Sequence, residues 1–135
     1  MNGNRKYLLD TNIIIRFLRG ETTLFSLFDD EENLFVSSIS VGELMYGAEL
    51  SSKAEFNRET YFGLCQALNI IAPNEYISAV YGKVKASLKR SGHPIPENDI
   101  WIAATAIAEN LTLITADSDF IGIENLSVDD LIIPR

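Results

Sequence analysis

The sequence predicts an α/β protein, a three-layer α/β/α domain built around a central, mainly parallel sheet of five strands. Short apolar runs of the kind found in buried strands alternate with longer segments whose apolar residues recur at helical spacing. This alternation is typical of strand–helix–strand units, which form parallel sheets with helices on both faces. The 135 residues, of which 47% are hydrophobic and 22% charged, have the size and composition of one globular domain, expected to span residues 1–135.

Each expected element rests on apolar spacing and on residues that begin or end it. In chain order, the elements are a strand at 6–9, helix 11–18, strand 34–37, helices 39–50 and 55–67, strand 68–71, helices 74–89 and 99–110, and strands 111–115 and 126–128. The first helix follows its strand without a linker and stops before Gly20. The second helix begins near Ser40, which stands three residues before Glu43 as in a capping box.

In the second half of the chain, the helix at 74–89 carries apolar residues three and four positions apart and ends before Gly92. Asp99 opens the next helix and, at 100° per residue, lies on the same side as the small residue Ala103. Thr105 is expected to mark the wetter side of this helix. Asp99 is therefore expected to face the interior of the protein, where a carboxylate needs a partner.

Four acidic residues stand where a parallel sheet would bring them together. Asp10 directly follows the first strand, and Asp117 follows the fourth strand by two residues. Glu43 and Asp99 lie near the starts of two helices. Ligands of open parallel sheets collect at the carboxyl ends of the strands, so we expect these four side chains to meet in one pocket.

Carboxylates within about 4–6 Å of one another repel, so such a cluster either holds protons or binds a cation. Hard oxygen ligands suit Mg²⁺ or Mn²⁺. Because Mg²⁺ in proteins is commonly completed by phosphate oxygens and water, the favoured chemistry is hydrolysis of a phosphodiester bond. His93 is the only histidine, which excludes a ribonuclease mechanism that uses two histidines.

Each acidic residue also has a local structural alternative. Asp10 could cap the following helix, Asp99 could favour a helix N-terminus, Glu43 could complete the capping box, and Asp117 could belong to a turn. None of these local roles explains why the residues converge at one edge of the expected sheet.

The same residues resemble the PIN domain family, and specifically the VapC-type ribonuclease toxins of prokaryotic toxin–antitoxin pairs. The resemblance runs in order through Leu8-Leu9-Asp10-Thr11-Asn12, Ser40 with Glu43-Leu44 and Gly47, Asn98-Asp99 with Ile102-Ala103-Ala104-Thr105-Ala106, and Leu113-Ile114-Thr115 with Asp117, Asp119 and Phe120. It implies a metal-dependent endoribonuclease, the toxin of a type II toxin–antitoxin pair.

By this resemblance, the acidic residues that bind Mg²⁺ or Mn²⁺ and carry catalysis correspond to Asp10, Glu43, Asp99 and Asp117. Asp10 and Asp99 are the preferred direct ligands, and Asp117 completes the expected metal set. The polar supporting positions correspond to Thr11, Asn12 and Thr115. Asp119 is a further supporting residue that could share or replace the role of Asp117, which we rank first.

The formal charge of −8 argues against a general attraction to RNA. Setting aside Asp119 and the four acidic residues above reduces it to −3. Arg16 and Arg19 are candidates for holding the RNA backbone. Phe17, Tyr46, Tyr76 and Tyr81 could stack on bases, although packing is the commoner use of aromatic side chains.

The resemblance implies three partners: an RNA substrate, a cognate antitoxin whose tail covers the acidic site, and a second copy in a homodimer. A cytoplasmic location is expected because Cys65 is the only cysteine and the N-terminus lacks the apolar core of a signal peptide. No membrane span is expected, because the longest mainly apolar stretch, residues 100–108, is too short to cross a bilayer.

Two other functions remain open at this point. The first is a PIN nuclease that matures RNA in a housekeeping pathway without an antitoxin. The second is a non-catalytic regulatory module with an acidic pocket, such as a phosphoacceptor domain, although residues 69–73 supply no acceptor aspartate and residues 115–120 no lysine. An aspartyl phosphatase is disfavoured because Asn12 stands where a second aspartate is needed.

Overall fold

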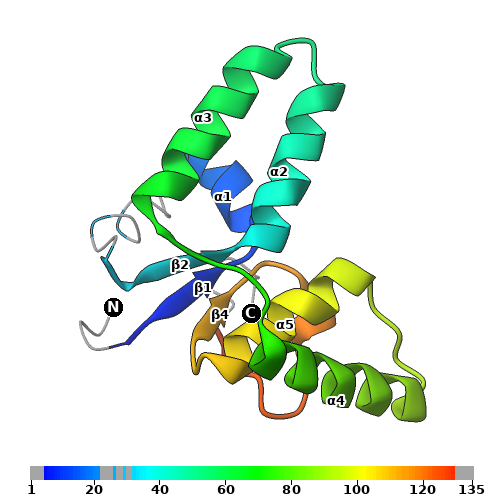
Figure 1. Ribbon diagram of the computed structural model, residues 1–135. Coiled ribbons are helices and arrows are strands. Elements are labelled where there is room, and N and C mark those ends of the chain that lie inside the picture. Colours follow the sequence, from blue (N-terminus) through cyan, green and yellow to red (C-terminus); the bar gives the residue numbers. More distant parts are fainter. Residues whose placement is uncertain (1–4, 22–25, 27–28, 30–31, 130–135) are drawn as a thin grey trace.

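A sheet of five short strands runs through the middle of the described molecule (Figure 1). The computed structural model describes residues 5–21, 26, 29 and 32–129. The strands are β1 (Tyr7–Leu9), β2 (Leu34–Ser37), β3 (Asn69–Ile71), β4 (Thr112–Ile114) and β5 (Val128–Asp129). They lie in the order β3-β2-β1-β4-β5, and all four pairings are parallel. The predicted five-stranded sheet is confirmed.

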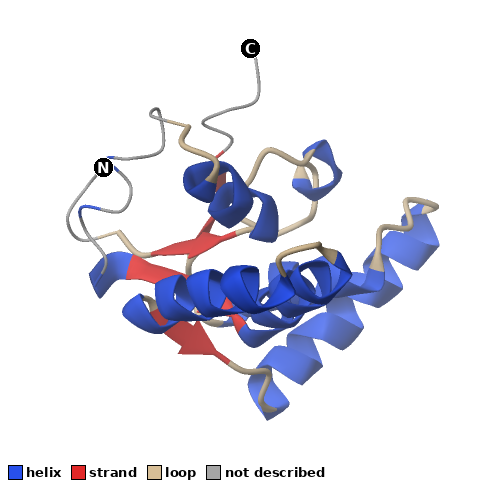
Figure 2. Ribbon diagram, turned by 90° about the horizontal axis from the view of Figure 1, so that it is seen from above, coloured by secondary structure: helices blue, strands red, loops and turns tan. Residues whose placement is uncertain are grey.

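Helices cover both faces of this sheet, as the sequence predicts. The helices are α1 (Thr11–Leu18), α2 (Ser38–Leu50), α3 (Ala54–Ala67), α4 (Glu75–Ser91) and α5 (Glu97–Ala108), with a short 3₁₀ helix, η2 (Ser118–Phe120). Figure 1 shows α1, α2 and α3 on one side of the strands and α4 and α5 on the other, and Figure 2 shows the layers from above. None of the described helices is long and apolar enough to cross a bilayer.

Alternate side chains of β1 enter two separate cores. Leu9 packs into the core beneath α1, α2 and α3 together with Ile13 and Ile114, and all three are fully buried. Leu8 enters the core beneath α4 and α5, where it joins Leu113. A strand covered on both faces has no side that favours polar residues, which explains the continuous apolar runs of the sequence.

Several boundaries differ from the sequence prediction. The helix α5 begins at Glu97, two residues before Asp99, because the backbone N–H groups of Asp99 and Ile100 already donate to the carbonyl of Pro96. Asp99 therefore occupies the third position of the helix. The last strand comprises Val128–Asp129 rather than residues 126–128, and its Asp129 pairs with Ile114 of β4.

Two local predictions for helix residues are wrong. Ser37, not Ser40, caps α2: its Oγ accepts a hydrogen bond from the N–H of Ile39 at 3.1 Å. Ser40 lies inside the helix and is buried, so it forms no capping box. Thr105 is also buried rather than on a wet side, and its hydroxyl donates to the carbonyl of Trp101. Thr105 can be buried because its hydroxyl has a hydrogen-bond partner within its own helix.

Removing side-chain volume is expected to destabilise the protein more at a buried position of the sheet than at an exposed one. Ile114→Ala truncates a fully buried side chain of β4 and is expected to cost about 2–5 kcal/mol of unfolding free energy. Ile70→Ala is the matched control, because Ile70 on β3 is 44% exposed; its cost is expected to be about 1 kcal/mol or less. Urea denaturation measures both, and equal costs would contradict the burial described above.

Candidate active site

The topology of the sheet places a crevice beside the end of β1. From β1 the chain proceeds to β2 and β3 on one side and then returns to β4 on the other side. Connections that leave two adjacent parallel strands in opposite directions open a crevice at their carboxyl ends, where ligands of such sheets bind. Asp10 follows β1 directly, and Thr115 follows β4 directly. The backbone N–H of Asp10 donates to the carbonyl of Ile114, so the two strand ends lie side by side.

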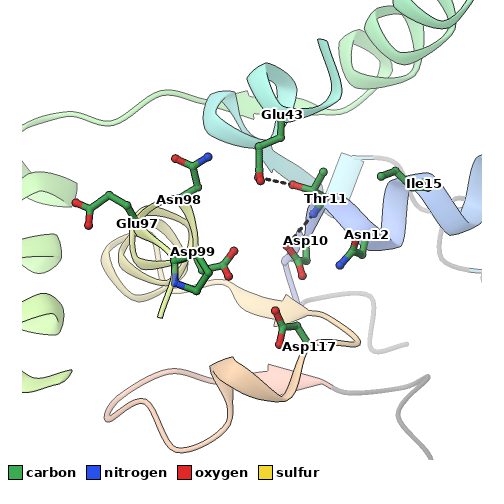
Figure 3. A pocket seen from close by; sticks show the side chains of 10 residues that line it. Asp10, Thr11, Asn12, Ile15, Glu43, Glu97, Asn98, Asp99 and Asp117 are labelled. Atoms are coloured by element: carbon green, nitrogen blue, oxygen red, sulfur yellow. Dashed lines mark hydrogen bonds between the residues drawn. The ribbon is translucent and has the colours of Figure 1, made fainter. Parts of the chain in front are cut away.

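A cavity of about 520 Å³ opens at this position (Figure 3). Its lining residues come from the end of β1, the helices α1, α2 and α5, and the segment after β4: they are Asp10, Thr11, Asn12, Ile15, Glu43, Pro96, Glu97, Asn98, Asp99 and Asp117. The four acidic residues predicted to converge therefore lie around one cavity, although they are up to 107 positions apart in the chain.

Asp10 is held in place by both of its carboxylate oxygens. Its Oδ1 accepts a hydrogen bond from the N–H of Thr11 at 2.8 Å, which caps α1, and its Oδ2 accepts one from the hydroxyl of Thr115 at 2.7 Å. The residue is only 4% exposed. The capping role proposed as a local alternative is thus correct, and it coexists with a place in the cavity because a carboxylate has lone pairs for further partners.

Thr115 joins the acid after β1 to the acid after β4. Its buried hydroxyl donates to Asp10 and accepts a hydrogen bond from the N–H of Asp117 at 2.9 Å. The Oδ1 of Asp117 in turn accepts from the N–H of Asp119 and begins η2. The turn role suggested for Asp117 is therefore also correct, and the turn itself fixes where the carboxylate stands.

Glu43 enters the cavity from α2 and is oriented by a residue of α1. Its Oε1 accepts a hydrogen bond from the hydroxyl of Thr11 at 2.8 Å, shown as a dashed line in Figure 3. Thr11 thus contacts two acids, since its backbone N–H binds Asp10. Asn12 lines the same cavity. Thr11, Asn12 and Thr115, predicted as supporting residues, all lie at the acidic cluster.

Of the four acidic residues at the cavity, Asp99 has the pKa that lies furthest from its ordinary value. Partial burial raises its pKa to about 7, and the neighbouring charges of Asp10, Asp117, Glu43 and Asp119 add to this effect. Burial also raises the pKa of Asp10, against the opposing effect of its hydrogen bonds with Thr115 and Thr11. Without a cation, their surroundings therefore make Asp99 and Asp10 easier to protonate than an aspartate in water.

The oxygen atoms around the cavity fit a hard divalent cation. Asp99, Asp117 and Asp119 each offer one carboxylate oxygen, and these atoms lie within 4.8 Å of one another. Oxygen-only donor sets are the ones that Mg²⁺ and Mn²⁺ prefer. This group contains Asp119 but not Asp10, whereas the cavity lining contains Asp10 but not Asp119. Asp117 belongs to both sets, so the geometry favours it over Asp119 as the fourth acid.

The sequence prediction missed part of the cavity lining, and its two RNA-backbone candidates, Arg16 and Arg19, lie outside that lining. Asn98 and Glu97 line the cavity although neither was a predicted site residue; the position of Asn98 beside Asp99 was the available signal. Glu97 forms an exposed ion pair with Lys85 at 3.1 Å. Arg16 and Arg19 lie on or next to α1 but not among the lining residues, so their contact with RNA stays a prediction.

Comparisons with known proteins agree with this architecture. The PIN domain model matches residues 7–126. Ribonuclease VapC1 of Haemophilus influenzae (strain R2866) is 37% identical over 81% of this chain and 84% of its own length. The crystal structure of VapBC2 from Rickettsia felis bound to a promoter DNA fragment has 33% identity, covers 91% of this chain and 96% of that chain, and has a TM-score of 0.81. A toxin–antitoxin complex from Klebsiella pneumoniae has 25% identity, coverages of 90% and 95%, and a TM-score of 0.72.

The fold, the acidic cavity and these comparisons define the class of the protein: the chain belongs to the PIN domain family. Within that family it is a VapC ribonuclease, the toxin of a type II toxin–antitoxin system. Of the two nuclease functions left open by the sequence, the comparisons therefore support the toxin rather than the housekeeping enzyme.

Replacing Thr115 is expected to lower the free energy of unfolding, because two polar groups lose their hydrogen-bond partner. Thr115→Val keeps the shape but removes the hydroxyl that binds Asp10 and the N–H of Asp117, so the unfolding free energy is expected to decrease by about 1–3 kcal/mol. Thr115→Ser retains the hydroxyl and is expected to recover most of this loss. Chemical denaturation of the three proteins measures the difference, and a Val variant as stable as the parent would contradict the bridging role.

The pKa of Asp99 predicts how stability depends on pH without divalent ions. The folded-state pKa of about 7 is above the ordinary value of 3.8, so between these pH values the unfolded chain binds fewer protons than the folded one. The stability that protonated Asp99 allows is therefore complete below 3.8 and lost as pH rises to about 7. In EDTA, the Tm of the parent is expected to drop relative to that of Asp99→Asn as the pH rises from about 4 to about 7, and to change little above that range.

Glu109→Gln is the matched control for this experiment, because Glu109 ends the same helix and is exposed. Its Tm is expected to follow that of the parent at every pH. Added Mg²⁺ is expected to narrow the gap between the parent and Asp99→Asn, because the ion favours the charged carboxylate. Parallel pH profiles for the parent and Asp99→Asn in EDTA would show that burial and repulsion do not act on this residue.

Proposed function

We propose that this chain hydrolyses RNA phosphodiester bonds in the acidic cavity, with Mg²⁺ or Mn²⁺ bound by Asp10, Asp99 and Asp117. The observation that carries the proposal is the convergence of four carboxylates from separate elements on one cavity. The catalytic residues of the proposal are these three aspartates and Glu43. Such a cluster is unfavourable for folding unless a ligand compensates for its repulsion, which supports a role in binding.

The hydrogen bonds around the cavity support a division of roles among these residues. Asp10 is the most buried and the most restrained of the acids, which suits a direct ligand whose position must not vary. Asp99 stands opposite on α5 and is the second proposed direct ligand. Glu43, held by Thr11, is free at its second oxygen to orient a water molecule or to accept a proton.

When bound, the divalent ion supplies positive charge beside the phosphate and lowers the pKa of coordinated water. The residues of the chain position the substrate and the nucleophile around that charge. Asp117 is carried by a turn anchored to Thr115, so its carboxylate approaches the cavity from the side opposite α2 (Figure 3). Asp119 supports this turn through its N–H and offers an alternative oxygen at the same place.

The lining of the cavity supports selective rather than general binding of RNA. Among the described lining residues there is no lysine or arginine. Contacts with phosphate therefore depend on the bound cation, and we propose that Arg16 and Arg19 add contacts with the RNA backbone beyond the cavity. With a net charge of −8, the rest of the surface gives little electrostatic attraction for RNA.

We further propose that a cognate antitoxin binds this toxin and that the chain forms a homodimer. The R. felis and K. pneumoniae relatives, described as VapBC2 on promoter DNA and as a toxin–antitoxin complex, support the first part. The negative charge of the cavity favours a partner segment that carries positive charge. The resemblance to VapC toxins supports the dimer.

Metal-dependent cleavage of RNA tests the proposed function directly. Purified parent protein is expected to cut structured or single-stranded RNA in Mg²⁺ or Mn²⁺ and to be inactive in EDTA. Asp10→Asn and Asp99→Asn keep the size of each side chain but remove its charge, and each is expected to lower the rate at least about a hundredfold. Gel analysis of end-labelled RNA measures the rates.

Glu109→Gln serves here as the control for loss of one negative charge on α5, and its rate is expected to equal that of the parent. Because all variants are purified in the same way, a contaminating ribonuclease would cut equally in every preparation. Equal cutting by the parent, Asp10→Asn and Asp99→Asn, or undiminished cutting in EDTA, would contradict the proposed site.

A further inference from the structure

A second cavity, of about 570 Å³, adjoins the acidic one. Its lining residues come from the first nine residues of α2 and the start of α5: they are Ser38, Ile39, Gly42, Glu43, Tyr46 and Asn98. Glu43 and Asn98 line both cavities. A nucleotide chain whose phosphate occupies the acidic cavity can therefore extend into the second cavity. The volume lies within the range of about 300–1,000 Å³ typical of small-ligand sites.

The side chain of Tyr46 is available to a ligand in this second cavity. It stands one helical turn after Glu43 and is 68% exposed. Within the described part of the chain its ring has no stacking partner, whereas Tyr81 stacks on Trp101 with ring centroids 3.9 Å apart. Because so little of its ring is buried, Tyr46 contributes little to the stability of the folded protein.

Gly42 keeps the space beside this ring open. Residues four positions apart are neighbours on a helix surface, so a side chain at position 42 would lie next to Tyr46. A Cβ at Gly42 meets no atom within 4 Å, so packing does not demand glycine here. Glycine inside a helix costs about 1 kcal/mol relative to alanine. The residue therefore lowers helix stability and leaves one cavity wall bare.

Asn98 supplies the polar group of the cavity. Its side chain extends from α5 toward α2 in Figure 3, and it makes no side-chain hydrogen bond to another described residue. A carboxamide offers both donors and an acceptor in one plane, the arrangement that recognises the edge of a nucleobase. No lysine or arginine lines this cavity among the described residues, and its one acidic residue, Glu43, lies on the side shared with the acidic cavity. Stacking on Tyr46 and hydrogen bonds with Asn98 are therefore the contacts available to a nucleobase there.

We infer that the second cavity is a nucleobase subsite for the RNA substrate, in which Tyr46 stacks on the base next to the scissile phosphate and Asn98 binds its edge. The inference rests on the proposed function, because it assumes that phosphate occupies the acidic cavity. Stacking on an aromatic ring tolerates different bases, whereas the amide of Asn98 discriminates among them. Tyr46 thus contributes affinity and Asn98 contributes preference for one base.

Short RNA substrates with and without a base at the nucleotide next to the cleaved bond test this inference. For the intact RNA, Tyr46→Ala is expected to raise KM about tenfold, in line with the contribution of one stacked base, and Tyr46→Phe is expected to stay within about twofold of the parent. For the abasic RNA, the parent and Tyr46→Ala are expected to have the same KM. Asn98→Ala is expected to change the relative rates for RNAs that differ at this one base.

Tyr76→Ala is the matched control, because Tyr76 on α4 is 73% exposed and lines neither cavity. Its KM is expected to equal that of the parent. Circular dichroism shows whether each variant is folded. Gly42→Leu gives a second measurement, because the leucine side chain fills the cavity while Tyr46 itself stays unchanged. This variant is expected to raise KM for the intact RNA only.

The outcomes separate this inference from the proposed function. If the parent cuts RNA and Tyr46→Ala has the parent's KM on intact RNA, the subsite is overturned while the nuclease site stands. If the parent does not cut, binding of the same RNAs is measured for Asp10→Asn with and without Tyr46→Ala. Weaker binding of the intact RNA by the variant that carries Tyr46→Ala supports the subsite, and equal binding by the two overturns it. If Tyr46→Ala cuts normally but escapes inhibition by the antitoxin, the cavity holds a protein segment instead.

Discussion

Mutual repulsion among carboxylates is the constraint on which the site depends. A parallel sheet places the ends of β1 and β4 side by side, and α2 and α5 add their own acids to the same cavity. Burial and, to a smaller extent, this repulsion raise the pKa of Asp99 to about 7, so the folded protein disfavours the charged form of this side chain. The divalent cation of the proposed function would offset this repulsion and supply the charge that hydrolysis of a phosphodiester bond requires.

The uncharged neighbours of the acids explain how the chain tolerates this arrangement. Thr115 binds Asp10 and the turn at Asp117, and Thr11 binds Asp10 and Glu43. Two threonines thus bind the carboxylates of Asp10 and Glu43 and the backbone of Asp117. These bonds position three of the four acids before any ligand arrives, so that little reorganisation of them is needed when a substrate binds. The site is built largely by hydroxyl and backbone donors rather than by positive side chains.

Most of the fold and the acidic part of the site were predictable from the sequence, because both depend on short-range patterns. Apolar periodicity located the five strands and the five α-helices but not the 3₁₀ helix η2, and the rule for parallel sheets brought together Asp10 and Asp117. The capping of α2 by Ser37 and the burial of Thr105 were not predictable, since each depends on which backbone groups already have partners. Asn98 was not predicted as a site residue although it stands beside Asp99 in the motif, because the second cavity that it lines is formed by the packing of α5 near α2.

Anomalous X-ray diffraction from crystals grown with Mn²⁺ would test the central claim most directly, because it locates the ion without any assumption about activity. The account predicts one or more Mn²⁺ peaks within coordination distance, about 2.0–2.3 Å, of carboxylate oxygens of Asp10, Asp99 or Asp117. A cavity that contains only water at saturating Mn²⁺, with these carboxylates in the arrangement described here, would contradict the claim that the cluster exists to hold a cation.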